Sequence, residues 1–104
     1  MKNTKIKHLK KAGWRVGDVQ EFLGISDQEM LLIEIKRSLV RVIRETRETK
    51  KITQQTLAKM LDSSQSRVAK LEAASRDVSL DLIVKALLVL GIKPKDLGRF
   101  ISSV

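Results

Sequence analysis

Residues 53–72 read Thr-Gln-Gln-Thr-Leu-Ala-Lys-Met-Leu-Asp-Ser-Ser-Gln-Ser-Arg-Val-Ala-Lys-Leu-Glu. Thr53 and Ser64 are residue types that cap the N-termini of helices, because their hydroxyl groups accept a hydrogen bond from a free backbone N–H. Asp62 and Ser63, which precede the second cap, are typical of a turn. The stretch therefore predicts two short helices, at 53–61 and 64–73, joined by a tight connection.

The apolar residues of this stretch predict how the two helices pack. Leu57, Ala58 and Leu61 fall on one face of the first helix, and Val68 and Leu71 fall on one face of the second. Ala58 is small and would allow the helices to approach closely. Because the connection is short, we expect the helices to fold against each other at a steep angle, as in a helix-turn-helix.

The remaining face of the second helix carries side chains suited to the edges of base pairs. The amide of Gln65 can pair with the N6 and N7 edge of adenine, and Arg67 can bind guanine or a phosphate. Lys70 adds a positive charge one turn further on, and Ser66 is short enough for close approach. This pattern favours insertion of the helix into a DNA groove.

Composition supports a helical domain with a polyanionic partner. The 104 residues correspond to one domain, and a hydrophobic content of 42% with only 3% aromatic residues suits packed helices of Leu, Ile, Val and Ala. The net charge is +9 and the isoelectric point is about 10.2, which favours binding to nucleic acid. A basic protein without such a partner is the alternative that charge alone leaves open.

Other classes of function find little support in the sequence. The absence of cysteine excludes disulfides, thiol chemistry and cysteine-based zinc sites, and a single histidine, His8, argues against a buried metal. We find no nucleophile with a nearby base and no phosphate-cradling glycine loop, so we expect neither an enzyme nor a cofactor. No apolar run approaches the roughly 20 residues of a membrane span. Without a secretory signal either, a cytoplasmic protein is the expectation.

The rest of the chain divides into an N-terminal extension and a helical domain. Residues 1–25 form a basic arm followed by an apolar segment from Trp14 to Ile25, with a short helix expected at about 17–23. Residues 26–104 form the domain, whose first helix would be long. The expected helices of the domain cover about 26–49, 53–61, 64–73, 79–91 and 94–101, bounded by Ser26, Thr53, Ser64, Ser79 and Pro94 at their starts.

Residues 39–101 resemble the Cro/CI-type helix-turn-helix of the XRE family of lambda-repressor-like regulators. The family run Leu-Ala-x-x-Leu-Gly-x-Ser-Gln-Ser-x-Val-x-x-Leu-Glu is matched by residues 57–72. Asp62 departs from it, because the family usually has glycine at this turn position of positive φ, which aspartate tolerates at moderate cost. The resemblance implies an all-α fold of five packed helices that binds palindromic double-stranded DNA as a homodimer.

The resemblance also implies roles for particular residues. A structural salt bridge is implied between Arg47, late in the first helix, and Glu72, at the end of the recognition helix. The loop that follows that helix usually touches the DNA backbone. The residues implied to contact base or phosphate are Gln54, Ser64, Gln65, Ser66, Arg67 and Lys70, with Ser75 and Arg76 in the loop.

The N-terminal third is similar to a segment in a subgroup of small XRE proteins that resemble HigA-type antitoxins. We therefore keep two hypotheses, a transcriptional regulator that most simply represses by occlusion and an antitoxin that binds a toxin and autoregulates its operon. An adaptor that binds only proteins is a third. A DNA-binding domain alone would not need the apolar residues Leu31, Leu32, Ile33 and Ile35. They would bury the segment from Trp14 to Ile25, form a dimer seam or dock a toxin, and we favour the first two together.

Overall fold

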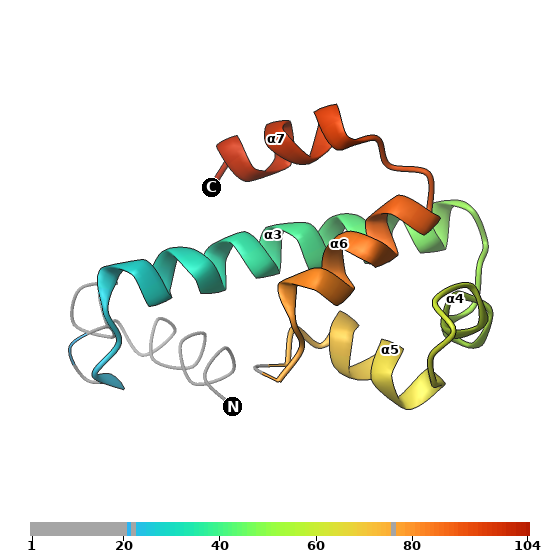
Figure 1. The fold of residues 1–104 in the computed structure, drawn as a ribbon, viewed down its shortest axis with the longest axis horizontal. Helices are drawn as coiled ribbons and strands as arrows, with labels where there is room; N and C mark the ends of the chain where they lie inside the picture. The colour runs from blue at the N-terminus through green and yellow to red at the C-terminus, as the bar shows by residue number, and fades with distance from the viewer. Residues whose placement is uncertain (1–20, 22, 76) are drawn as a thin grey trace.

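The computed structural model describes residues 21, 23–75 and 77–104 of the chain. The basic arm, nearly all of the short helix expected at 17–23, and Arg76 lie outside the described residues. The described residues contain five helices and no strand, as Figure 1 shows, so the expected all-α, five-helix fold is confirmed. The helices are α3 (Asp27–Thr49), α4 (Gln54–Met60), α5 (Gln65–Glu72), α6 (Leu80–Val89) and α7 (Pro94–Ser102).

Hydroxyl groups set the starts of four helices. In each case the side-chain oxygen of the residue before the helix accepts a hydrogen bond from the backbone N–H three residues later, which satisfies one of the free donors there. The helix α7 begins instead with Pro94, whose fixed φ suits the first helical position. The four hydroxyl caps are Ser26 to Glu29 at 3.2 Å, Thr53 to Thr56 at 3.0 Å, Ser64 to Arg67 at 3.2 Å and Ser79 to Leu82 at 3.2 Å.

The ends of the same four helices share one backbone motif. A residue with positive φ follows each C-terminal cap, and the next residue donates its N–H to a carbonyl five positions back, which is the Schellman arrangement. Only one of the four is glycine, Gly91, at φ 95°. Asp62 has φ 52°, the positive value expected at this turn. The other two are Lys51 at 57° and Ala74 at 54°.

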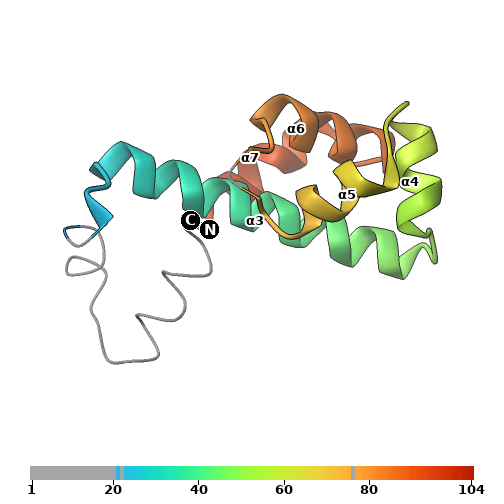
Figure 2. The same cartoon turned by 90° about the horizontal axis from the view of Figure 1, so that it is seen from below.

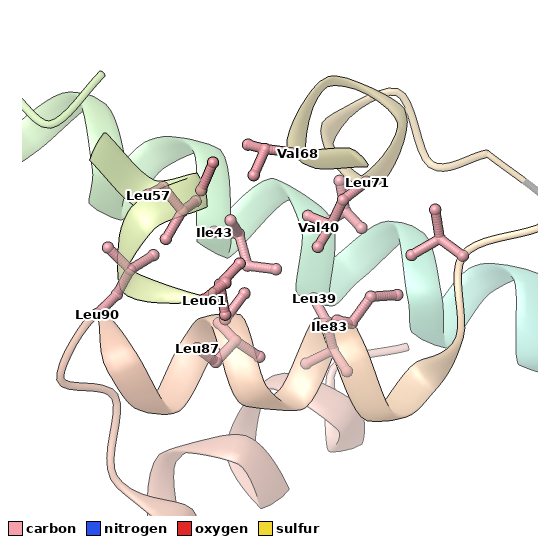
Figure 3. Close-up of a cluster of buried hydrophobic side chains, with 13 residues drawn as sticks. Leu39, Val40, Ile43, Leu57, Leu61, Val68, Leu71, Ile83, Leu87 and Leu90 are labelled. Atoms are coloured by element: carbon pink, nitrogen blue, oxygen red, sulfur yellow. The ribbon is translucent and has the colours of Figure 1, made fainter. Parts of the chain in front are cut away.

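The core lies between the second half of α3 and helices α4, α5 and α6. Figure 3 shows the side chains of Leu39 and Ile43 from α3 meeting leucines, isoleucine and valine from the other three helices. The helix α7 lies on the other side of α3 from α4 and α5 (Figure 1). Its residues Leu97 and Phe100 are partly buried against the core. The largest fully buried side chains of the core are those of Leu39, Ile43, Leu57, Val68, Leu71, Ile83, Leu87 and Leu90.

The first half of α3 extends beyond the other helices of the domain (Figures 1 and 2). A second, small apolar cluster lies there, formed by Ile25 and Met30 with Leu23 and Ile33 packed against it. No helix among the described residues is long and apolar enough to cross a membrane. The fold thus places a helical core at one end of α3 and leaves the other end without a described partner helix.

Candidate nucleic-acid interface

The helices α4 and α5 meet at a steep angle, as the sequence predicts. In Figure 1 α4 is seen nearly end-on, whereas α5 lies across the view, and the two are joined by three residues of turn after the Leu61 cap. Ser63 donates its backbone N–H to the carbonyl of Ala58 at 2.8 Å, which closes the turn. Ala58 itself is buried, so a larger side chain would push the helices apart.

The orientation of α5 is fixed by its buried face. Val68 and Leu71 are 1% and 0% exposed, and both point into the core in Figure 3. Because these residues hold one side of the helix inward, the opposite side must face solvent. The residues on that side are all exposed, and they are Gln65, Ser66, Arg67, Ala69 and Lys70.

Two predicted contact residues lie at helix starts beside this surface. Ser64 is exposed, and its hydroxyl oxygen caps α5 by accepting the N–H of Arg67. Gln54 opens α4 and is partly buried. Its side-chain nitrogen donates to a carboxylate oxygen of Glu72 at 3.2 Å. That bond uses one of the two N–H groups of the amide and fixes the position of the side chain at the start of the helix.

A buried carboxylate at the end of α5 holds three helices together. The side chain of Glu72 is 1% exposed, and Arg47 of α3 pairs with both of its oxygens, through Nη2 at 2.8 Å and Nε at 2.5 Å. Arg47 also donates to the carbonyl of Ile52 at 2.9 Å. The structure therefore brings together the two residues that sequence analysis pairs, and the fork geometry of the guanidinium explains the choice of arginine.

The network around Glu72 contains two members that sequence reasoning missed. Besides Gln54, the guanidinium of Arg44 donates to the backbone carbonyl of Glu72 at 3.1 Å and lies 3.7 Å from its carboxylate. Arg44 stands one turn of α3 from Arg47, so its helical spacing is the signal that could have found it. Gln54 gives no such signal, because it comes from another helix.

The charges of this network shift the acid–base equilibria of its members. Burial alone would raise the pKa of Glu72, but the hydrogen bonds from Arg47 and Gln54 and the nearby positive charges outweigh it and lower the pKa below its ordinary value of 4.5. The hydrogen bond to Glu72 raises the pKa of Arg47 in turn. The carboxylate is therefore held ionised inside the protein.

The loop after α5 contains Ser75, one of the two loop residues predicted to contact DNA. Ser75 is only 9% exposed, its N–H donates to the carbonyl of Lys70 at 3.0 Å, and its own carbonyl accepts from Val78 at 3.1 Å. These bonds fix the backbone of the loop, and the contact of Ser75 with DNA stays a prediction. Arg76, the other of the two loop residues, is outside the described residues.

Two lysines, one in α3 and one at its C-terminal cap, also stabilise the fold. The ammonium group of Lys36 donates to the carbonyl of Val78, just before α6, at 2.9 Å, and that of Lys50 donates to Leu90, at the end of α6, at 2.6 Å. These contacts connect α3 to both ends of α6. Of the other basic residues on α3, Arg37 is partly buried and Arg41 is exposed.

Comparison with known proteins identifies the family. A helix-turn-helix family model matches residues 43–97, more than half of the chain, and it covers α4, α5 and α6 entirely. No curated protein and no solved structure matches the chain. In the described residues no group of three or more His, Cys, Asp or Glu side chains could hold a metal ion. The chain belongs to the Cro/CI-type helix-turn-helix family of DNA-binding transcription regulators.

Proposed function

We propose that this protein is a sequence-specific repressor that binds a palindromic operator as a homodimer and acts by occluding promoter DNA. The observation that carries the proposal is the two-sided character of α5. One side is locked into the core through Val68 and Leu71, and the other presents only short or polar side chains to solvent. Such a helix can enter the major groove without moving any core residue.

Each exposed polar side chain of α5 has a chemical role in this proposal. Gln65 stands at the first position of α5 and reads adenine with its amide, while Arg67 reads guanine or clamps a phosphate. Lys70 contacts the phosphate backbone, and the short Ser66 allows the helix to approach the bases. At the domain edge, Gln54 binds a phosphate together with the free N–H groups at the start of α4.

The experiment that tests base reading compares operator and random DNA. Replacing Arg67 by alanine is expected to weaken operator binding by about 1–3 kcal/mol, while binding to random DNA changes much less. Gel retardation or fluorescence anisotropy measures both affinities. Arg99→Ala is the matched control, because Arg99 is exposed on α7, on the other side of α3 from α5, and both variants should keep wild-type stability.

Two outcomes would count against the proposal. Equal losses on operator and random DNA would remove the base-reading role of Arg67 and leave only a phosphate contact. An absence of retardation of any genomic fragment by the wild type would favour the adaptor hypothesis. Selection of bound sites from random DNA should return a palindrome with half-sites about one helical turn, roughly 10 bp, apart, if two recognition helices bind together.

The antitoxin hypothesis uses the same DNA surface and adds a toxin partner. Because the segment assigned to toxin binding lies almost entirely outside the described residues, no described contact favours this alternative over the simple repressor. A neighbouring open reading frame for a small, basic, ribonuclease-like protein would favour it. Co-purification of that protein with this chain, lost on removal of residues 1–25, would then establish it.

A further inference from the structure

The loop after α5 runs along the middle of α3 (Figure 2). At its start Arg44 donates to the backbone carbonyl of Glu72 at 3.1 Å, and at its end Lys36 donates to the carbonyl of Val78 at 2.9 Å. Eight residues of helix (44 − 36) separate the two donors, which is about two turns, or about 12 Å. A ligand that approaches the loop along this length therefore also approaches the side chains of α3 beside it.

These side chains of α3 include a basic strip. Arg37, Arg41 and Arg44 follow one another at spacings of four and three residues, which places them along one side of the helix. The side chain of Arg44 stays 53% exposed despite its bond to Glu72. Those of Arg37 and Arg41 take part in no hydrogen bond or ion pair within the described residues. We call the three residues the arginine strip.

The arginine strip and the end of α5 line one hollow. Ala73 and Ala74 form its side toward α5, and their methyl groups add little bulk between the strip and that helix. Ala73 is exposed and stands four residues, about one turn, after the exposed Ala69. The surface of α5 that is proposed to face DNA therefore continues through two alanines to the arginine strip.

The positive charge of this surface comes from α3 and not from the loop. Among the described residues of the loop none is positively charged, and Asp77 is exposed. Two carboxylates, those of Glu34 and Glu45, also border the hollow. They share a side of α3 with Ser38, whose hydroxyl donates to the carbonyl of Phe100 in α7. The side of the hollow toward α5 is therefore its basic side.

We propose that the arginine strip binds phosphates of the DNA backbone at the edge of the groove that α5 enters. This inference rests on the proposed function, because it adds a contact to the same protein–DNA complex. Arginine suits the role, since its guanidinium group can donate two parallel hydrogen bonds to phosphate oxygens and always carries its charge. The seven residues from Arg37 to Arg44 span about 10 Å, or about three nucleotide steps of roughly 3.4 Å rise on one strand.

The test removes the two arginines of the strip that have no described partner. The double variant Arg37→Ala, Arg41→Ala leaves the network of Glu72 in place and should keep the wild-type circular dichroism. Its matched control is Lys85→Ala, Arg99→Ala, which removes the same charge from exposed residues of α6 and α7. The strip variant should lose affinity for operator and random DNA by equal factors. Its slope of log affinity against log salt concentration should fall by about 2 for each bound protomer, with the control nearly unchanged.

A neutral methylphosphonate placed at one position of the operator at a time locates the contact. At one or more positions it should weaken binding of the wild type and leave binding of the strip variant unaffected. The proposal is overturned if the strip variant has the same slope as the control, or if every position that weakens the wild type weakens the strip variant equally. If Arg67→Ala still loses operator binding in that case, the proposed function stands without the strip. A wild type that binds no DNA would remove both.

Discussion

Glu72 shows how one buried residue can position side chains that are predicted to contact DNA. Its carboxylate is buried, and a buried charge is tolerated only when partners replace the lost water. The partners come from α3 and α4, so the single group at the end of α5 fixes the recognition helix and the side chain of Gln54 in one arrangement. Loss of the carboxylate should therefore affect geometry at both predicted contact sites.

Removing Arg47 should be strongly destabilising, because it leaves the charge of Glu72 buried without its main partner. We expect Arg47→Ala to lower the free energy of unfolding by about 3–5 kcal/mol, measured by urea denaturation. In the double variant Arg47→Ala, Glu72→Gln the loss should be smaller, because no charge remains unpaired. A double variant at least as unstable as Arg47→Ala alone would show that burial of the charge is not the cause.

The lowered pKa of Glu72 predicts acid sensitivity of defined sign. The native state binds the proton of this carboxyl less readily than the unfolded chain, so the stabilisation is complete above pH 4.5. It is lost as the pH falls from 4.5 through the lower native pKa. Unfolding free energies measured from pH 6 downward should decline less steeply in Glu72→Gln than in the wild type. Parallel declines would contradict this assignment.

At the level of single residues, the sequence predicted pairs but not networks. Arg47 and Glu72 could be paired through the family resemblance. The amide of Gln54 could not be assigned to the same carboxylate, because that contact depends on the angle between helices. For the same reason the burial of Ser75 escaped prediction, since a serine in a loop gives no indication that the loop folds inward.

At the scale of elements, helix starts were predictable because their causes are local. A hydroxyl residue followed by an apolar period predicts a start, and each of the four expected caps makes its bond. The connections from α3 to the ends of α6 were not predictable. Lys36 and Lys50 look like ordinary solvated lysines in the sequence, and only packing brings carbonyls within their reach.

The residues of positive φ that follow the helix C-caps offer sites for stabilising substitutions. Lys51 has φ 57°, a conformation that costs a side-chain-bearing residue about 1–2 kcal/mol and glycine little. After subtracting the greater unfolded-state entropy of glycine, Lys51→Gly should raise the free energy of unfolding by about 0.5–1 kcal/mol. Lys85→Gly, in the middle of α6, should lower it by about 1 kcal/mol. Destabilisation of both variants in thermal unfolding would refute the argument.

At the scale of the whole molecule, the fold separates two kinds of surface. The core and the recognition helix lie at one end of α3 (Figure 2), and the small apolar cluster of Ile25 and Met30 lies at the other. The first half of α3 is therefore separate in space from the recognition helix. The net charge of +9 should attract the protein as a whole to DNA, because electrostatic attraction to DNA depends on the total distribution of charge.

The salt dependence of binding can count the protomers on one operator. Each phosphate contact contributes about 0.9 to the slope of log affinity against log salt concentration. If Lys70 of each protomer contacts a phosphate, Lys70→Ala should reduce the slope by about 1 for a bound monomer and by about 2 for a bound dimer. Lys85→Ala, which removes the same charge from α6, should leave the slope nearly unchanged. We expect a reduction of about 2, measured by anisotropy titrations on operator DNA. A reduction of about 1 would contradict the homodimer, and no reduction would remove Lys70 from the contact surface.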